Sequence, residues 1–250
     1  MLTQLIFLCS FGFLAAAVDA IAGGGGLISL PALLLVGISP HFALGTNKFA
    51  ATMGALNSSI TFARSGKVYV SLVKWQIPFT LVGASLGVFS VLHVNSDFLN
   101  KVVPVLILLV GIYTLFHKNL GLETRFQGLT HSNLAVGCLL AFVLGFYDGF
   151  FGPGAGSFLI FLFITLYGFD FVTSSANAKV LNFVSNFISL ILFAWNGKIL
   201  YDYGIPMAFF MLLGSQLGTK LAIHKGAGLV KPIFITMSLL VAVKLIYQSL

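Results

Sequence analysis

Two aspartates in this sequence lie within apolar stretches, and a run of glycines follows each of them. Asp19 precedes four consecutive glycines at 23–26, and Asp148 precedes the sequence Gly-Pro-Gly-Ala-Gly at 152–156. A carboxylate is costly in an apolar environment, and consecutive glycines end a helix because they permit positive φ and close backbone contacts. In membrane transporters, unwound backbone of this kind lines a cavity and binds the solute. The two breaks therefore predict the two halves of one transport site.

Polar side chains at helical spacing accompany these breaks. Lys48 and Lys179 each lie in an apolar stretch that follows a break, with asparagines nearby. Such side chains should face a bundle interior or a water-filled cavity, because lipid would leave them unpaired. Helices that begin at the glycines would add backbone amides and positive dipole ends. We predict an anion site whose substrate-binding residues are Lys48, Lys179, Asn47, Asn177, Asn182, Gly24, Gly25, Gly154 and Ala155.

The sequence leaves the roles of the charged residues open. Asp19 and Asp148 are candidates for proton coupling, but they could equally pair with the lysines or cap the glycine turns. Burial favours the protonated form of an aspartate, whereas a nearby lysine favours the ionised form. A lysine near the end of a span can also extend its ammonium group to the interface and bind nothing.

The composition identifies the class of protein. Of the 250 residues, 58% are hydrophobic and 8% are charged, whereas a soluble domain has about 25% charged residues. We therefore expect an all-α polytopic protein of the cell (inner or plasma) membrane, surrounded by lipid. The net charge of +7 comes from residues dispersed between the apolar segments, which indicates topology signals and no nucleic-acid partner.

Ten apolar segments follow one another along the chain. They are residues 3–22, 27–37, 42–63, 70–92, 99–116, 132–151, 156–168, 174–196, 202–222 and 229–248. Segments 27–37 and 156–168 are shorter than the ~20 residues that cross a bilayer. Each of them directly follows a glycine break, so each is either the second half of an interrupted crossing or a re-entrant segment.

The chain contains an internal repeat, which predicts the domain organisation. Asp19 and Asp148 are 129 positions apart, and after a two-residue insertion an offset of 131 relates Lys48 to Lys179 and Gly83 to Gly214. We call residues related in this way repeat mates. The predicted parts are a first membrane repeat (1–116), a polar connecting loop (117–131) and a second membrane repeat (132–250).

The distribution of basic residues favours inverted repeats. Loops 64–74 and 220–231 are basic, whereas the corresponding loops around 198–202 and 97–101 are nearly neutral. If five segments cross per repeat, both basic loops lie on the cytoplasmic side, as the positive-inside rule requires. We therefore predict two inverted-topology repeats with glycine-broken or re-entrant helices that meet near the membrane midplane. Both termini would lie outside the cytoplasm.

The motifs at the two breaks resemble those of a known family. Residues 19–27 (Asp-Ala-Ile-Ala-Gly-Gly-Gly-Gly-Leu), 30–32 (Leu-Pro-Ala) and 45–48 (Gly-Thr-Asn-Lys) resemble the first-repeat signature of the TauE/SafE family of sulfite exporters. Residues 145–157 and Ala178-Lys179 resemble its second-repeat signature. The resemblance covers essentially the whole chain and implies an inner-membrane transporter of sulfite, sulfonates or related small organic anions.

These observations predict a secondary transporter that exports small sulfur-containing anions such as sulfite or organosulfonates. The sequence leaves open whether transport is coupled to protons. A passive anion channel is the alternative within transport, and a membrane-embedded enzyme or assembly factor is the alternative from another class. We expect no enzymatic activity, no cofactor and no metal site, because the sequence has no nucleotide-binding loop, nucleophile motif or His/Cys/carboxylate cluster. The oligomeric state stays open, and a homo-oligomer is compatible with the sequence.

Overall fold

The structure, a computed structural model, describes residues 2–99, 102, 105, 125–126 and 128–225. Every element within these ranges is a helix, which confirms the all-α prediction for the described part. Of the predicted segments, 99–116 and 229–248 fall outside the described residues apart from 99, 102 and 105. The helices are α1 (Leu2–Ala22), α2 (Gly26–Leu35), α3 (Pro40–Arg64), α4 (Val70–Leu92), α6 (His131–Phe150), α7 (Ala155–Tyr167), α8 (Phe171–Trp195) and α9 (Tyr201–Lys225).

Several of these helices are suited to a bilayer. Helices α1, α4, α6 and α8 are long and apolar enough to cross a membrane. Helices α2 and α7 have 10 and 13 residues, which is about 15 and 20 Å of helix and less than the ~30 Å hydrocarbon core. Helix α3 has 25 residues, but it is less apolar because it carries buried polar side chains such as Asn47, Lys48 and Thr52. The protein is a multi-pass membrane protein.

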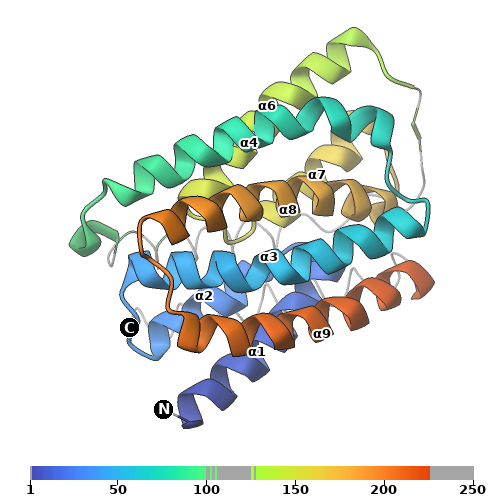
Figure 1. The fold of residues 1–250 in the computed structure, drawn as a ribbon. Helices are drawn as coiled ribbons and strands as arrows, with labels where there is room; N and C mark the ends of the chain where they lie inside the picture. Colours follow the sequence, from blue (N-terminus) through green and yellow to red (C-terminus); the bar gives the residue numbers. More distant parts are fainter. Residues whose placement is uncertain (1, 100–101, 103–104, 106–124, 127, 226–250) are drawn as a thin grey trace.

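The two predicted repeats are interleaved, because the fourth helix of each packs along the first helix of the other. Helix α4 lies along α6, and α9 lies along α1 (Figure 1). A Cβ atom at Gly83 of α4 would lie 2.1 Å from the carbonyl oxygen of Phe142, and one at its repeat mate Gly214 would lie 2.1 Å from that of Phe13. These glycines therefore allow helix backbones to touch, as small residues do in membrane proteins.

The buried apolar side chains follow the same interleaving. One cluster combines α1, α2, α3 and α9, joined by parts of α4 and α8. The other cluster combines α4, α6, α7 and α8. Each cluster thus contains helices of both repeats, and the two repeats pack as one unit. The boundaries 1–116, 117–131 and 132–250 stay a prediction, since most of the connecting loop lies outside the described residues.

The helix directions in Figure 1 bear on the predicted inversion. Helix α3 runs from left to right and its repeat mate α8 from right to left, and α4 and α9 are likewise opposed. No membrane is present to define sides, so the inverted orientation stays a prediction that labelling can test.

Ser65 and Asn196 provide that test, because they are exposed repeat mates just after α3 and α8. In a background without Cys9 and Cys138, we expect Ser65→Cys to react with a membrane-impermeant thiol reagent from the cytoplasmic side. Asn196→Cys should react only from the opposite side, because inverted repeats place mates on opposite faces. Labelling of both positions from one side would contradict the inverted orientation.

Candidate functional site

Helices α1 and α6 end at the predicted glycine breaks, and the two breaks contact each other. Gly23 and Gly154 have φ angles of +76° and +82°, a conformation that side chains rarely adopt. The carbonyl oxygen of Gly23 accepts a hydrogen bond from the backbone N–H of Ser157 at 3.0 Å. A Cβ atom at Gly23 would lie 2.4 Å from the carbonyl carbon of Gly156. The glycines therefore permit both the chain reversal and the close contact where the repeats meet.

Two buried ion pairs lie beside these breaks, and each joins one repeat to the other. Lys48 Nζ of α3 lies 2.7 Å from Asp148 Oδ1 of α6, and Lys179 Nζ of α8 lies 2.5 Å from Asp19 Oδ2 of α1. The sequence left open whether the aspartates pair with the lysines, and in the structure they do. Each ammonium group therefore has a carboxylate partner, and the four charges cancel. The anion-binding role of the lysines stays a prediction.

The two pairs have different surroundings. The Asp148 side chain is 3% exposed and accepts a second hydrogen bond at 3.2 Å from Asn182 Nδ2. The Asp19 side chain is 24% exposed and accepts a hydrogen bond at 3.2 Å from the backbone N–H of Gly25. The repeat mate of Asn182 is Ala51, so Asp19 lacks the amide partner that Asp148 has. Asp148 is enclosed, whereas Asp19 is accessible.

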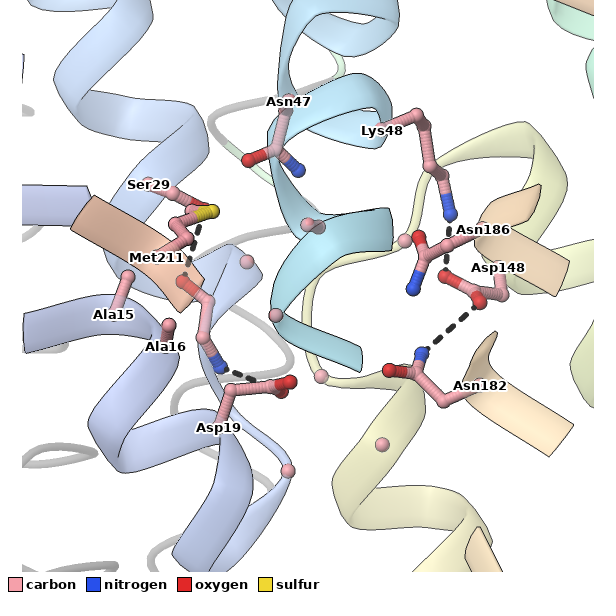
Figure 2. A pocket seen from close by; sticks show the side chains of 18 residues that line it. Ala15, Ala16, Asp19, Ser29, Asn47, Lys48, Asp148, Asn182, Asn186 and Met211 are labelled. Carbon is pink, nitrogen blue, oxygen red and sulfur yellow. Dashed lines mark hydrogen bonds and ion pairs between the residues drawn. The ribbon is translucent and has the colours of Figure 1, made fainter. Parts of the chain in front are cut away.

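The Asp19 side chain is exposed to a small cavity between the two breaks. Figure 2 shows Asp19 on one side of this cavity and Lys48, Asp148 and Asn182 on the other. The cavity volume is about 30 Å³, which is room for about two water molecules. Its lining residues are Ala15, Ala16, Asp19, Gly23, Gly25, Gly26, Ser29, Asn47, Lys48, Ala51, Gly54, Asp148, Gly152, Gly154, Gly156, Asn182, Asn186 and Met211.

Most of the predicted substrate-binding residues line this cavity. Among them, Asn47 Oδ1 is buried and has no hydrogen-bond partner within the described residues. Such a group is rare in native proteins and indicates an absent partner such as a ligand or water. The predicted residues in the lining are Asn47, Lys48, Asn182, Gly25 and Gly154, together with both coupling candidates, Asp19 and Asp148.

Four predicted residues do not line the cavity. Lys179 does not line the cavity itself, but it forms an ion pair with Asp19, which does. The carbonyl oxygen of Gly24 accepts the backbone N–H of Leu27 at the start of α2, and the N–H of Ala155 donates to Gly152. These two residues therefore shape the breaks.

Asn177, the fourth of these residues, holds the end of a neighbouring helix. Its Oδ1 accepts the backbone N–H of Tyr69 at 2.8 Å, just before α4. Its repeat mate Thr46 accepts the N–H of Leu200 at 3.0 Å, just before α9. The recurrence of this bond in both repeats indicates a structural role, in which a side chain satisfies an unpaired amide at a helix start.

Comparison with known proteins identifies the family. Residues 8–245 match the family model described as sulfite exporter TauE/SafE. The chain belongs to the TauE/SafE family. It is 42% identical to a probable membrane transporter protein of Haemophilus influenzae, over 98% of this chain and 95% of that protein. It is 41% identical to the probable membrane transporter protein YfcA of Escherichia coli, over 94% of this chain and 87% of that protein.

More distant TauE/SafE relatives also align along their whole length. The probable membrane transporter protein YunE of Bacillus subtilis is 24% identical, over 99% of both chains. No solved structure matches the chain significantly. Family membership and these relatives support a membrane transporter.

Several lining residues of this TauE/SafE protein lie outside the predicted list of substrate-binding residues, among them Asn186, Ser29 and Met211. Asn186 lies one turn after Asn182 on the same face of α8, so it continues the polar stripe that the sequence predicts there. Ser29 donates from its hydroxyl to the carbonyl oxygen of Gly25 at 3.1 Å, and Met211 comes from α9. Neither has a local signal, because each lies in an ordinary apolar helix. Among the described residues, no group of three or more His, Cys, Asp or Glu side chains could hold a metal ion.

Proposed function

We propose that this protein is a secondary transporter that carries a small sulfur-containing anion, such as sulfite or an organosulfonate, across the membrane together with a proton. The observation that carries the proposal is the pair of buried Asp–Lys bridges around a small polar cavity where two broken helices meet. Its support also includes the description of the family as sulfite exporters and the cavity volume of about 30 Å³, which favours a small solute.

The cancellation of charge around the cavity explains why a proton and an anion would bind together. With both bridges formed, the site has no net positive charge to stabilise an anion. A proton that binds Asp19 Oδ2 neutralises this carboxylate and leaves the ammonium group of Lys179 without a partner. That ammonium group can then donate hydrogen bonds to an oxygen of the anion, a favourable charge-assisted contact. One proton and one anion thus enter the site as a neutral pair.

Asp19 is better placed than Asp148 to accept this proton from the cavity. Both side chains line the cavity, but that of Asp19 is 24% exposed, whereas that of Asp148 is 3% exposed and is held by Lys48 and Asn182. The unpartnered Asn47 Oδ1 is an acceptor, which suits a protonated oxygen of the substrate or a bound water. Asp148 and Lys48 would then hold the second break in place.

Transport by reconstituted protein tests this proposal. Purified protein is first screened by thermal shift against sulfite, sulfate, thiosulfate, sulfoacetate, taurine and simple carboxylates, because a bound ligand raises the melting temperature. We expect stabilisation by sulfite or a sulfonate, and a larger shift at acidic than at neutral pH. In proteoliposomes, uptake of that anion should saturate, show counterflow and increase when the outside is acidified.

The passive channel makes the opposite prediction for counterflow. A channel would conduct the anion without saturation at moderate concentrations and would not accelerate labelled uptake when unlabelled anion is loaded inside. Linear flux without counterflow would therefore refute the carrier. Saturable counterflow that is indifferent to a pH gradient would refute the proton coupling alone.

A further inference from the structure

Four buried polar atoms on α4 and α8, two helices that pack against each other and against α6, have no hydrogen-bond partner within the described residues. They are Gln76 Oε1 and Thr80 Oγ1 of α4, and the hydroxyl oxygens of Ser185 and Ser189 of α8. All four residues are at most 1% exposed. Buried polar groups in native proteins are almost always paired with protein or ordered water. These atoms therefore require partners beyond those that the described part of the chain supplies.

The orientation of Gln76 is fixed by its neighbours. The Tyr167 hydroxyl donates to the backbone carbonyl of Asn133 at 3.1 Å, so it can only accept from Gln76. It does so from Gln76 Nε2 at 3.0 Å. The amide cannot be reversed without losing this bond, and Oε1 is left facing away from Tyr167 without a donor.

The serines of this junction differ from the lipid-facing serines of α4. Ser85 and Ser90 are partly exposed, and each donates to the carbonyl oxygen four residues earlier at 2.8 Å. A serine without another partner satisfies itself in this way within a helix. Ser185 and Ser189 make no such bond, so their hydroxyls are directed to a different partner.

The equivalent residues of the other repeat indicate how α4 and α8 pack. A Cβ atom at Gly54, the repeat mate of Ser185, would lie 3.4 Å from the carbonyl oxygen of Met211, the repeat mate of Thr80. We therefore expect Ser185 of α8 to lie beside Thr80 of α4.

These polar side chains occur in only one of the two repeats, because their repeat mates are mostly apolar. The repeat mates of Gln76, Thr80 and Ser185 are Met207, Met211 and Gly54, none of which has a hydrogen-bonding side chain of comparable polarity. Ser58, the mate of Ser189, is bonded to Thr219 at 2.9 Å. The polar set therefore does not follow from the repeat, and it lies on the side of the enclosed Asp148.

We infer that the junction of α4, α6 and α8 holds bound water molecules that lead past Asp148 to the cavity and serve as the proton route to Asp19. Water supplies both donors and acceptors, as this mixture of hydroxyls and an amide oxygen requires. Ser185 lies three residues after Asn182, whose amide donates to Asp148, so the waters begin about one turn from the enclosed carboxylate. The proton route rests on the proposed coupled transport, whereas the bound water does not.

Radiolytic hydroxyl-radical labelling of the wild-type protein tests the water without any transport measurement. Radicals form from water molecules bound beside a side chain, so Tyr167 should be labelled although it is only 4% exposed. Met207 on the apolar mate side is fully buried and should stay unlabelled, although its thioether is readily oxidised. An unlabelled Tyr167 would overturn the inference. A labelled Tyr167 in a protein without proton coupling would support the water and refute only the route.

The combined substitution Thr80→Val and Ser185→Ala tests the route. We expect proton-driven uptake to fall about tenfold, the scale of one lost hydrogen bond in the path, while anion affinity stays within about twofold. Thr80→Ser keeps the hydroxyl and should transport like the wild type. Unchanged proton-driven uptake in a more stable double variant would show a dry junction and overturn the route. If the double variant does not fold, the labelling of Tyr167 still decides whether water is present.

Discussion

Replacing Asp19 with asparagine should abolish proton-driven uptake of the anion in proteoliposomes while preserving its counterflow. In the proposed cycle, the empty carrier returns with Asp19 and Lys179 paired and neutral. Asparagine leaves the Lys179 side chain, which is 1% exposed, as an unpaired buried cation during that return. Such a stranded charge costs roughly 3 kcal/mol or more, which corresponds to about a hundredfold loss of net uptake.

Counterflow separates this defect from a failure to fold or bind. During exchange the carrier moves only when loaded, and the anion then neutralises Lys179 in both the wild type and the variant. Asp202→Asn is the control, because Asp202 is an exposed acid in the first turn of α9, and it should behave like the wild type. Retention of net proton-driven uptake by Asp19→Asn would show that the proton binds elsewhere.

Replacing Lys48 with methionine should cause the largest loss of stability. Methionine keeps the length of the side chain but leaves Asp148, which is 3% exposed, without its ammonium partner. Removing one member of a buried pair costs about 3–5 kcal/mol. Thermal or chemical unfolding in a mild detergent measures this loss. The double variant Lys48→Met, Asp148→Asn should recover most of the stability, because Asp148→Asn removes the stranded charge and can still bond to Asn182.

The second ion pair provides a matched comparison for this result. Lys179→Met removes the corresponding ammonium group, but Asp19 is 24% exposed, so water in the cavity can solvate the remaining carboxylate. We expect a smaller loss than for Lys48→Met. Equal losses at both positions would contradict the assignment of Asp148 as enclosed and Asp19 as accessible. A Lys48→Met protein as stable as the wild type would contradict the ion pair itself.

The sequence by itself determined the membrane class, the positions of the helices in the described part and the two breaks. Hydropathy and glycine act locally, so the ends of α1 and α6 at Ala22 and Phe150 follow from nearby residues. The repeat also identified Lys48 and Lys179 as equivalent, and the resemblance of the motifs at the breaks indicated the family that the comparison then established.

The tertiary structure alone decided which charges meet and which amides reach the cavity. Lys48 and Asp148 are 100 positions apart and pair across the repeats, which depends on the interleaving of helices and on no local pattern. Asn177 and Asn182 look alike in sequence, but five residues turn a helix by about 140°. One therefore supports the start of α4 while the other bonds to Asp148. The direction in which a helix presents each side chain is set by packing against neighbours far away in the sequence.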